Sequence, residues 1–293
     1  MRRRFFILHN PKAGLTARRH YHMILSLLRD AGAHIELVET SRHGEGMRVA
    51  AEAALSGSFD AIVAAGGDGT VHDAAEGLLG CAMPLGVIPM GTANVFAREV
   101  GLPLSSESVA STLLYGTTRS IPVGEINARP FLFVVGIGFD AKAVAYFEAS
   151  GARQFGQIGL FAPVIQALIS HSDSVLRVTT DGGSTEAKWV IVTRVRRYAG
   201  GLLLSRDADI TQTNFYVVRF GGHGKLVLLR QLSALACDLV RYDPDVNIEA
   251  AEWVRVENDA PLPVQVDGEM LGTLPVTIKL HPERLQLIFP RDP

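Results

Sequence analysis

The sequence predicts two domains: an α/β N-terminal domain with an open parallel sheet in a Rossmann-like three-layer arrangement, and a mainly antiparallel β-sandwich C-terminal domain. Short apolar strands alternate with helices over the first ~120 residues, polar glycine-containing loops follow three of these strands, and strands dominate after Ile121-Pro122-Val123-Gly124. We therefore expect a first domain over residues 1–123 and a β-rich second domain over 124–283. A last strand, at about 284–293, is a candidate to return to the first domain.

The elements of the first domain follow from short apolar runs and from helical spacing of apolar residues. Strands are expected at 4–8, 34–39, 59–64 and 85–88, and helices from a Thr16 cap to Gly32 and over 47–55, 70–79, 93–99 and 108–114. Thr70 and Asp73 have the spacing of a capping box. Because helices separate consecutive strands, the strands should lie parallel with helices on both faces of the sheet.

The second domain should consist mostly of strands joined by short turns. Strands are expected at 131–135, 175–180, 189–195, 215–220, 253–257, 264–266, 276–279 and 285–289, with helices over 157–170 and 226–240.

The bulk composition excludes several classes of protein. A formal net charge of −2 over 293 residues gives no electrostatic attraction to nucleic acid, and none is expected as a partner. The apolar run after Arg2-Arg3-Arg4 is too short for a signal peptide, and the windows 131–139 and 159–169 are too short to span a bilayer. We expect a cytoplasmic protein with reduced core thiols at Cys81 and Cys237.

Three loops at strand ends suit a nucleotide. The segment Ala64-Ala65-Gly66-Gly67-Asp68-Gly69-Thr70 follows a buried strand and opens a helix, and glycines let a backbone approach phosphate at a helix N-terminus. Asn10–Gly14 and Pro89–Asn94 occupy the same place after two other strands, so all three loops should share one sheet edge. Taken singly, each is also compatible with a tight turn, and the first with an aspartate cap.

These loops, in this order, resemble the diacylglycerol kinase catalytic-domain family, which includes bacterial lipid kinases and is related in fold to NAD kinases and phosphofructokinases. The similarity rests on Asn-Pro-x-x-Gly, Gly-Gly-Asp-Gly-Thr and Gly-Thr-Ala-Asn, and it continues in Val135–Asp140 and in Val266-Asp267-Gly268-Glu269. The resemblance implies ATP and Mg²⁺ as cofactors. It also implies Glu269 as the base that takes the substrate hydroxyl proton and Asp68 as the residue that positions Mg²⁺–ATP, with an exchange of these roles left open. The implied ATP-binding residues are Asn10, Pro11, Lys12, Ala13, Gly14, Thr40, Gly66, Gly67, Asp68, Gly69, Thr70, Val71, His72 and Thr92.

The sequence also departs from the family pattern, most of all over residues 194–213. Gln212 stands where an aspartate helps to bind a structural Mg²⁺ in some bacterial relatives, so that site is expected to be incomplete unless Asp207 or Asp209 compensates. The arginines of this segment could meet anionic lipid headgroups or could form a solvated basic strand edge. They are Arg194, Arg196, Arg197 and Arg206.

The expected function is that of an ATP-dependent kinase that phosphorylates the hydroxyl of a diacylglycerol-like lipid. Its partners would be ATP and a lipid alcohol, with a peripheral position at the inner membrane face and a homodimer as one candidate assembly. Two alternatives stay open: a kinase of a soluble or sphingoid-type alcohol, as in NAD kinases, and a catalytically silent nucleotide- or lipid-binding regulator. A dehydrogenase is rejected. Gly136–Ala141 imitates the dinucleotide fingerprint, but Ile158 stands where its acidic residue should be.

Overall fold

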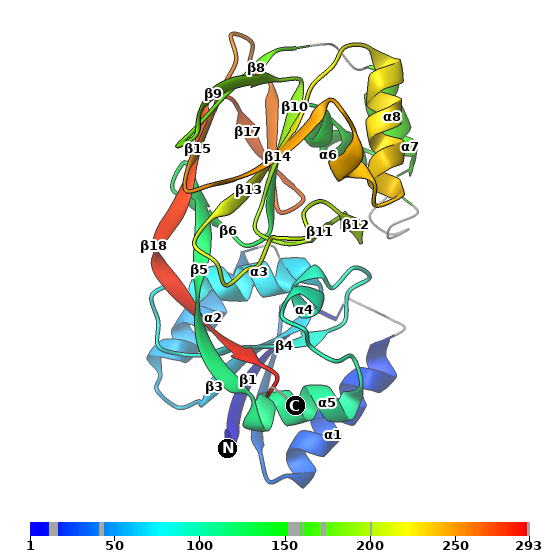
Figure 1. The fold of residues 1–293 in the computed structure, drawn as a ribbon. Coiled ribbons are helices and arrows are strands. Elements are labelled where there is room, and N and C mark those ends of the chain that lie inside the picture. Colours follow the sequence, from blue (N-terminus) through cyan, green and yellow to red (C-terminus); the bar gives the residue numbers. More distant parts are fainter. Residues whose placement is uncertain are drawn as a thin grey trace. The chain divides into compact units, whose positions relative to one another are not determined.

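The computed structural model describes residues 1–11, 17–40, 44–151, 159, 161–170, 174–199 and 201–291. The chain divides into two compact units, unit 1 with Met1–Val123 and Pro282–Pro293, and unit 2 with Gly124–His281. Two strands, β5 (Thr117–Ile126) and β18 (Val276–Phe289), run from one unit into the other (Figure 1). None of the helices among the described residues is long and apolar enough to cross a membrane.

Unit 1 is built on a parallel sheet. Its strands run in the order β2-β1-β3-β4, and the end of β18 lies parallel to β4 with Leu287 opposite Leu85. Every residue of β3 is buried, as expected for a strand covered on both faces. The four strands are β1 (Arg4–His9), β2 (His34–Glu39), β3 (Ala61–Gly66) and β4 (Leu85–Pro89). The predicted α/β class with an open, mainly parallel sheet is confirmed.

Right-handed crossovers distribute the helices over both faces of this sheet. The chain moves one way from β1 to β2 and the other way from β2 through β3 to β4, so α1 must cover one face and α2 and α3 the opposite one. Accordingly α1 packs on α5 and α2 packs on α3 (Figure 1). The helices are α1 (Arg18–Asp30), α2 (Glu45–Leu55), α3 (Asp68–Gly77), α4 (Val95–Glu99) and α5 (Ser106–Tyr115).

The predicted capping box is wrong. Helix α3 begins at Asp68 after an extended Gly67 that supplies no side-chain cap, so Thr70 already lies inside the first turn. Asp73 instead accepts a hydrogen bond from the backbone N–H of Gly44 at 3.3 Å, which ties the start of α2 to α3. The N-cap position is Gly67, three residues before the Thr70 that the box spacing indicates.

Unit 2 is a β-sandwich. One antiparallel sheet has the order β14-β13-β10-β7-β16-β17, and a second layer contains β18 up to His281, β15, β8 and β9. The core between them includes Val135, Val178, Val192, Phe215 and Val256. The strands are β6 (Arg129–Phe131), β7 (Val134–Ile137), β8 (Leu176–Thr180), β9 (Gly183–Ala187), β10 (Trp189–Thr193), β13 (Phe215–Phe220), β14 (Val246–Ala251), β15 (Val254–Glu257), β16 (Pro263–Val266) and β17 (Glu269–Thr273). The predicted mainly antiparallel sandwich is confirmed.

Several predicted elements of unit 2 differ from the structure. The strand predicted at 131–135 is split between β6 and β7, and the two strands predicted at 276–279 and 285–289 are one strand, β18, because its chain stays extended through Pro282. Helix α6 (Phe139–Ala149) was not predicted, because its glycine-rich start imitates a loop. The remaining elements are α7 (Phe161–Ile169), α8 (Lys225–Ala236), the 3₁₀ turn η3 (Val240–Tyr242), β11 (Arg197–Tyr198) and β12 (Leu202–Leu203). Of the predicted core thiols, Cys237 is exposed and Cys81 only partly buried.

Candidate active site

Two of the three predicted loops of unit 1 touch backbone to backbone. A Cβ at Gly91 would lie 2.7 Å from the Cα of Gly67, and the N–H of Met90 donates to the carbonyl of Gly66 at 2.8 Å. At Gly66 itself a Cβ would collide with the Thr70 side chain. Gly91 is therefore required for the contact between the loops after β3 and β4, and Gly66 is required for the packing of Thr70 against the end of β3.

Gly69 is a different kind of glycine. It lies in the first turn of α3, its φ is not in the left-handed region, and a Cβ built there meets no atom within 4 Å. A glycine inside a helix costs about 0.5–1 kcal/mol relative to alanine. Neither the backbone nor the neighbours explain this cost. Gly69 thus leaves an open surface at a helix N-terminus, where N–H groups lack intrahelical acceptors.

Asp68 binds the start of the neighbouring helix. Its two carboxylate oxygens accept the N–H groups of Val95 and Phe96, both at 3.1 Å, and so cap α4. Asn94, at φ +46°, closes the same loop by exchanging two hydrogen bonds with the backbone of Gly91. The carboxylate predicted to position Mg²⁺–ATP therefore also fixes the loop that carries Thr92.

The other predicted nucleotide residues lie at different places in unit 1. Asn10 and Thr40 lie together at the ends of β1 and β2, where the N–H of Asn10 donates to Ala65 and that of Thr40 donates to His9. The side chains of Thr70, Val71 and His72 are buried in unit 1, whereas Thr92 is exposed. Pro11 begins a turn after β1, and Lys12, Ala13 and Gly14 lie outside the described residues.

In unit 2, Glu269 stands at the end of a tight hairpin between β16 and β17. Asp267 and Gly268 form its two-residue turn, with φ of +49° and +87° as in a type I′ turn. The Asp267 carboxylate anchors this turn by accepting three backbone N–H groups at 2.7–2.9 Å, from the consecutive residues Leu132, Phe133 and Val134.

The side chain of Glu269 has a cationic partner that the sequence did not indicate. Arg129 donates to its Oε2 at 2.9 Å, and about a third of each side chain is exposed. A pair this exposed contributes little to stability, about 0–1 kcal/mol, but it restricts where the carboxylate points. Since 140 positions separate the two residues, no spacing rule could have found the pair.

A buried acid lies behind this hairpin. Asp140 is 3% exposed, and burial raises the pKa of its carboxyl group to about 7, although the hydrogen bond from Gln265 works in the opposite direction. Gln265 Nε2 donates to Asp140 Oδ2 at 2.6 Å, and the Tyr198 hydroxyl is bonded to Oδ1. Gln265 Oε1 in turn accepts the N–H of Gly268 at 2.9 Å, so the network reaches the turn that precedes Glu269. The sequence had indicated Asp140 only as part of a matching motif.

In the segment that departs from the family pattern, a buried arginine binds loop carbonyl groups. Arg194 is 1% exposed, and its guanidinium donates to the carbonyl oxygens of Ile210, at 2.7 Å, and Gln212, at 3.5 Å. Asp209 is engaged within its own turn with Thr211. The described residues contain no group of three or more His, Cys, Asp or Glu side chains that could hold a metal. Arg194 was predicted either to contact lipid headgroups or to lie on a solvated strand edge. Both predictions are wrong, because its guanidinium group is buried and donates to loop carbonyl groups.

Comparison with known proteins agrees with this architecture. Residues 4–126 match the family described as Diacylglycerol kinase catalytic domain, and residues 133–289 match the YegS C-terminal NAD kinase beta sandwich-like domain. A diacylglycerol kinase of Bacillus subtilis (strain 168) is 27% identical over 98% of this chain and 96% of its own. One from Mycobacterium tuberculosis (strain H37Rv) is 29% identical over 97% of this chain and 94% of its own. A crystal structure of a diacylglycerol kinase from Bacillus anthracis superposes with a TM-score of 0.75 at 20% identity, over 98% of this chain and 97% of that one.

The fold, the loop motifs and both matched domains lead to one assignment. The chain belongs to the bacterial diacylglycerol kinase family, with a diacylglycerol kinase catalytic domain followed by a YegS-type C-terminal domain.

Proposed function

We propose that this protein is an ATP-dependent lipid kinase that phosphorylates the hydroxyl group of a diacylglycerol-like lipid. The observation that carries the proposal is the glycine ledge of unit 1, where Gly67 and Gly91 touch and Gly69 leaves an open helix N-terminus. Such a surface suits the phosphates of a nucleotide. The relatives named diacylglycerol kinase, which match nearly the whole chain, support the lipid acceptor.

ATP would bind unit 1, which is the proposed nucleotide domain, and the lipid would bind unit 2. The proposed ATP contacts are the backbone of Gly66–His72, the loop from Asn10 to Gly14, Thr40 and Thr92. Mg²⁺ would enter with ATP as part of the substrate. Asp68 is the residue of the ledge that could hold it, because a carboxylate oxygen can make a second contact besides the one that caps α4.

Glu269 would act as the general base. A lipid alcohol is a weak nucleophile, so a positioned carboxylate should accept its proton as the oxygen attacks the γ-phosphorus and ADP leaves. The anchored turn at Asp267 and the ion pair with Arg129 hold this carboxylate in one place, which is what such a step requires. Work on a membrane lipid implies a peripheral position at the inner membrane face.

A second candidate is a kinase of a soluble or sphingoid-type alcohol, which the NAD kinase-like description of the C-terminal domain favours. One assay separates the two. The purified chain is incubated with labelled ATP and diacylglycerol, a sphingoid alcohol or NAD, and the products are separated by thin-layer chromatography. We expect the label in the diacylglycerol product. Label in NAD or in the sphingoid alcohol alone would favour the second candidate.

Glu269→Gln tests the mechanism, since it keeps the size of the side chain but loses the base. We expect kcat to fall by roughly 10²–10⁴ while ATP affinity stays constant. Glu257→Gln is the matched control, because Glu257 is also a strand glutamate paired with an arginine, Arg255, at 2.8 Å. Near-normal kcat in Glu269→Gln would leave Asp68 as the base. No transfer by the wild type to any alcohol would favour a silent nucleotide- or lipid-binding regulator.

A further inference from the structure

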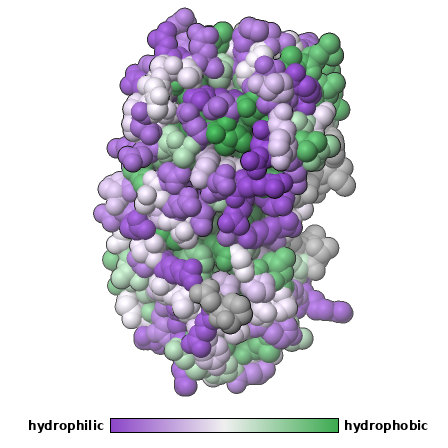
Figure 2. Space-filling view, in the orientation of Figure 1, coloured by the Kyte–Doolittle hydropathy of each residue, from purple (hydrophilic) through white to green (hydrophobic). Residues whose placement is uncertain are grey.

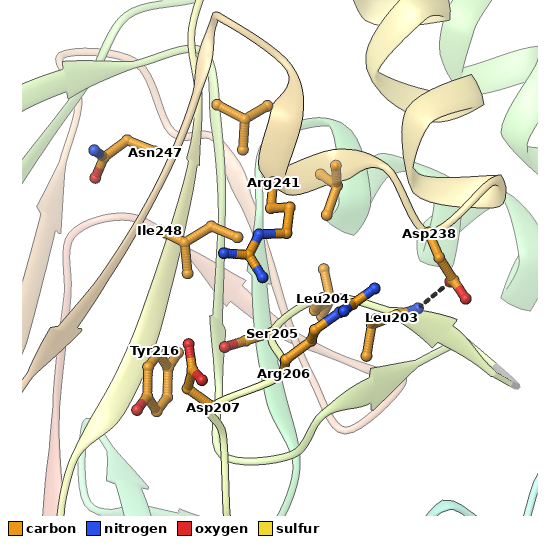
Figure 3. Close-up of a pocket in the computed structure, with 12 residues that line it drawn as sticks. Leu203, Leu204, Ser205, Arg206, Asp207, Tyr216, Asp238, Arg241, Asn247 and Ile248 are labelled. Carbon is orange, nitrogen blue, oxygen red and sulfur yellow. Dashed lines mark hydrogen bonds between the residues drawn. The ribbon is translucent and has the colours of Figure 1, made fainter.

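We propose that a pocket of unit 2 binds the phosphate group of a small phosphoester or a phospholipid headgroup. The pocket has a volume of about 300 Å³, at the lower end of the roughly 300–1,000 Å³ range of small-molecule sites. It is formed by the segment around β12, by β13, by η3 and by β14 (Figure 3). In the six-stranded sheet, β14 and β13 lie at one edge and β17, which carries Glu269, at the other. The pocket is therefore separate from the proposed catalytic carboxylate.

Two arginines give the pocket its chemistry. The side chains of Arg206 and Arg241 both extend into the space between η3 and the segment after β12 (Figure 3). Among the residues that the structure describes, neither guanidinium has a hydrogen bond or an ion pair, and Arg241 makes only a stacking contact with Tyr242 at 5.4 Å. Two unneutralised guanidinium groups that share one pocket favour an anion with several oxygens, as a phosphate has.

The carboxylates of the pocket do not occupy this place. Asp238 accepts the N–H of Leu203 at 3.3 Å, and in Figure 3 the Asp207 carboxylate points the opposite way from Arg206, toward Tyr216. The pocket is thus polar at two ends. The arginines suit phosphate, and the end at Asp207 suits a hydroxyl or an amine attached to it.

A buried hydroxyl supports a ligand independently of the arginines. Ser205 lines the pocket, is 3% exposed, and its Oγ has no hydrogen-bond partner among the described residues. A buried hydroxyl without a partner is unfavourable, so it is usually satisfied by a ligand or by an ordered water. A phosphate group bound in the pocket could offer one oxygen to Ser205 and others to the guanidinium groups that line the same pocket.

The chain segment that follows Arg241 is held in place by an ion pair. Arg230 on α8 forms a two-pronged ion pair with Asp243, both hydrogen bonds at 2.8 Å, and also contacts Asp245. These contacts clamp the turn between η3 and β14, so the segment that carries Arg241 needs little ordering when a ligand arrives.

The surroundings point to a lipid headgroup as one source of the phosphate. Leu239 and Tyr242, on either side of the pair Val240–Arg241, are 51% and 67% exposed, and Leu226 on the adjacent α8 is 84% exposed. Hydrophobic side chains are visible on the surface of this unit around α8 in Figure 2. Exposed apolar residues beside cationic ones are typical of a surface that meets phospholipid.

The test begins with inorganic phosphate, titrated at constant ionic strength and followed by calorimetry. In the double variant Arg206→Gln/Arg241→Gln we expect affinity to fall by about 10-fold or more, because charge-assisted hydrogen bonds are lost. Ser205→Ala should also weaken binding without lowering the thermal midpoint, since it removes an unsatisfied buried hydroxyl. Arg255→Gln, an exposed arginine of the other layer, should bind as the wild type does.

Vesicles distinguish the source of the phosphate. The same four proteins are sedimented with vesicles of phosphatidylcholine alone or mixed with phosphatidic acid. A loss of sedimentation confined to the pocket variants assigns the site to a headgroup, and loss of phosphate binding without any change in sedimentation assigns it to a free phosphoester. If the wild type binds no phosphate, or if the folded double variant binds it equally well, the proposed site is refuted. Glutamine at positions 206 and 241 breaks no ion pair among the described residues, and the thermal midpoint verifies the fold.

Discussion

Replacing Asp140 by asparagine should remove a pH dependence that this buried carboxyl group imposes on the stability of unit 2. Asparagine reproduces the protonated acid. Its amide nitrogen can donate to the Tyr198 hydroxyl, and its amide oxygen can accept from Gln265 Nε2, which are the two contacts that the carboxyl group makes. The substitution therefore removes the titration while retaining the hydrogen bonds.

The magnitude follows from the pKa of Asp140, which burial raises from 3.8 to about 7. Between these values the native protein holds a proton that the unfolded chain releases, so the wild type loses stability as pH rises, by about 1.4 kcal/mol per pH unit. The loss is complete above pH ~7 and amounts to at most about 4 kcal/mol. Below pH ~4 both states are protonated and the effect is absent. Asp140→Asn should match the wild type near pH 4 and be more stable by up to about 4 kcal/mol near pH 7.

Urea unfolding at a series of pH values measures this difference. Both tryptophans of the chain, Trp189 and Trp253, lie in unit 2, so their fluorescence reports the unit that contains Asp140. Subtracting the two proteins at each pH cancels the contribution of the other titrating groups. A difference in unfolding free energy that stays constant from pH 4 to pH 8 would refute the raised pKa and the reasoning built on burial.

Three further outcomes are expected. Gly69→Ala should raise the unfolding free energy of unit 1 by about 0.5–1 kcal/mol and weaken ATP binding in a titration; unchanged ATP affinity would count against the glycine ledge as the phosphate site. Arg194→Met should lower the unfolding free energy of unit 2, because loop carbonyl groups lose a buried hydrogen-bond donor. EDTA should leave the thermal midpoint of the wild type unchanged, and a midpoint lowered by EDTA would show that a structural metal is bound. Burial opposes ionisation of Asp60, but hydrogen bonds from Arg3 and Arg4 outweigh it and hold its pKa below the usual value of 3.8. Asp60→Asn should therefore destabilise the protein at neutral pH, and the difference should shrink as pH falls below 3.8 and through the lowered pKa of the folded state, as measured by circular dichroism. A difference that stays constant over this acidic range would contradict the lowered pKa.

The fold and the glycine loops could be predicted because their signals are local. Alternation of apolar strands and helices predicts a parallel sheet. Gly66 and Gly67, directly at the end of β3, indicate that other atoms approach the backbone closely there. The capping role of Asp68 could not be predicted in this way, because its partners on α4 lie 27 and 28 positions further along the chain.

The parts of the site that the sequence did not reveal all depend on contacts between distant segments. Asp140 meets Tyr198 across 58 positions and Gln265 across 125, and only the fold brings them together. Arg194 was expected at the surface because a fully buried arginine is uncommon, and its burial depends on carbonyl groups that face inward only in the folded loop. Helix α6 was missed for a different reason, since its glycine-rich start resembles a turn in the local sequence.

The network around Asp140 explains how a titrating group can lie next to the proposed base without disturbing it. Gln265 accepts the N–H of Gly268 and donates to Asp140 Oδ2, an oxygen that can accept this bond whether the carboxyl group is charged or neutral. Only Tyr198 must change its role, because its hydroxyl donates to the carboxylate but accepts from the carboxylic acid. Protonation of Asp140 thus reverses only the hydrogen bond with Tyr198, and the hydrogen bonds that lead to the hairpin stay the same. Ionisation of Asp140 should therefore alter stability while the turn, and with it the position of Glu269, stays as it is.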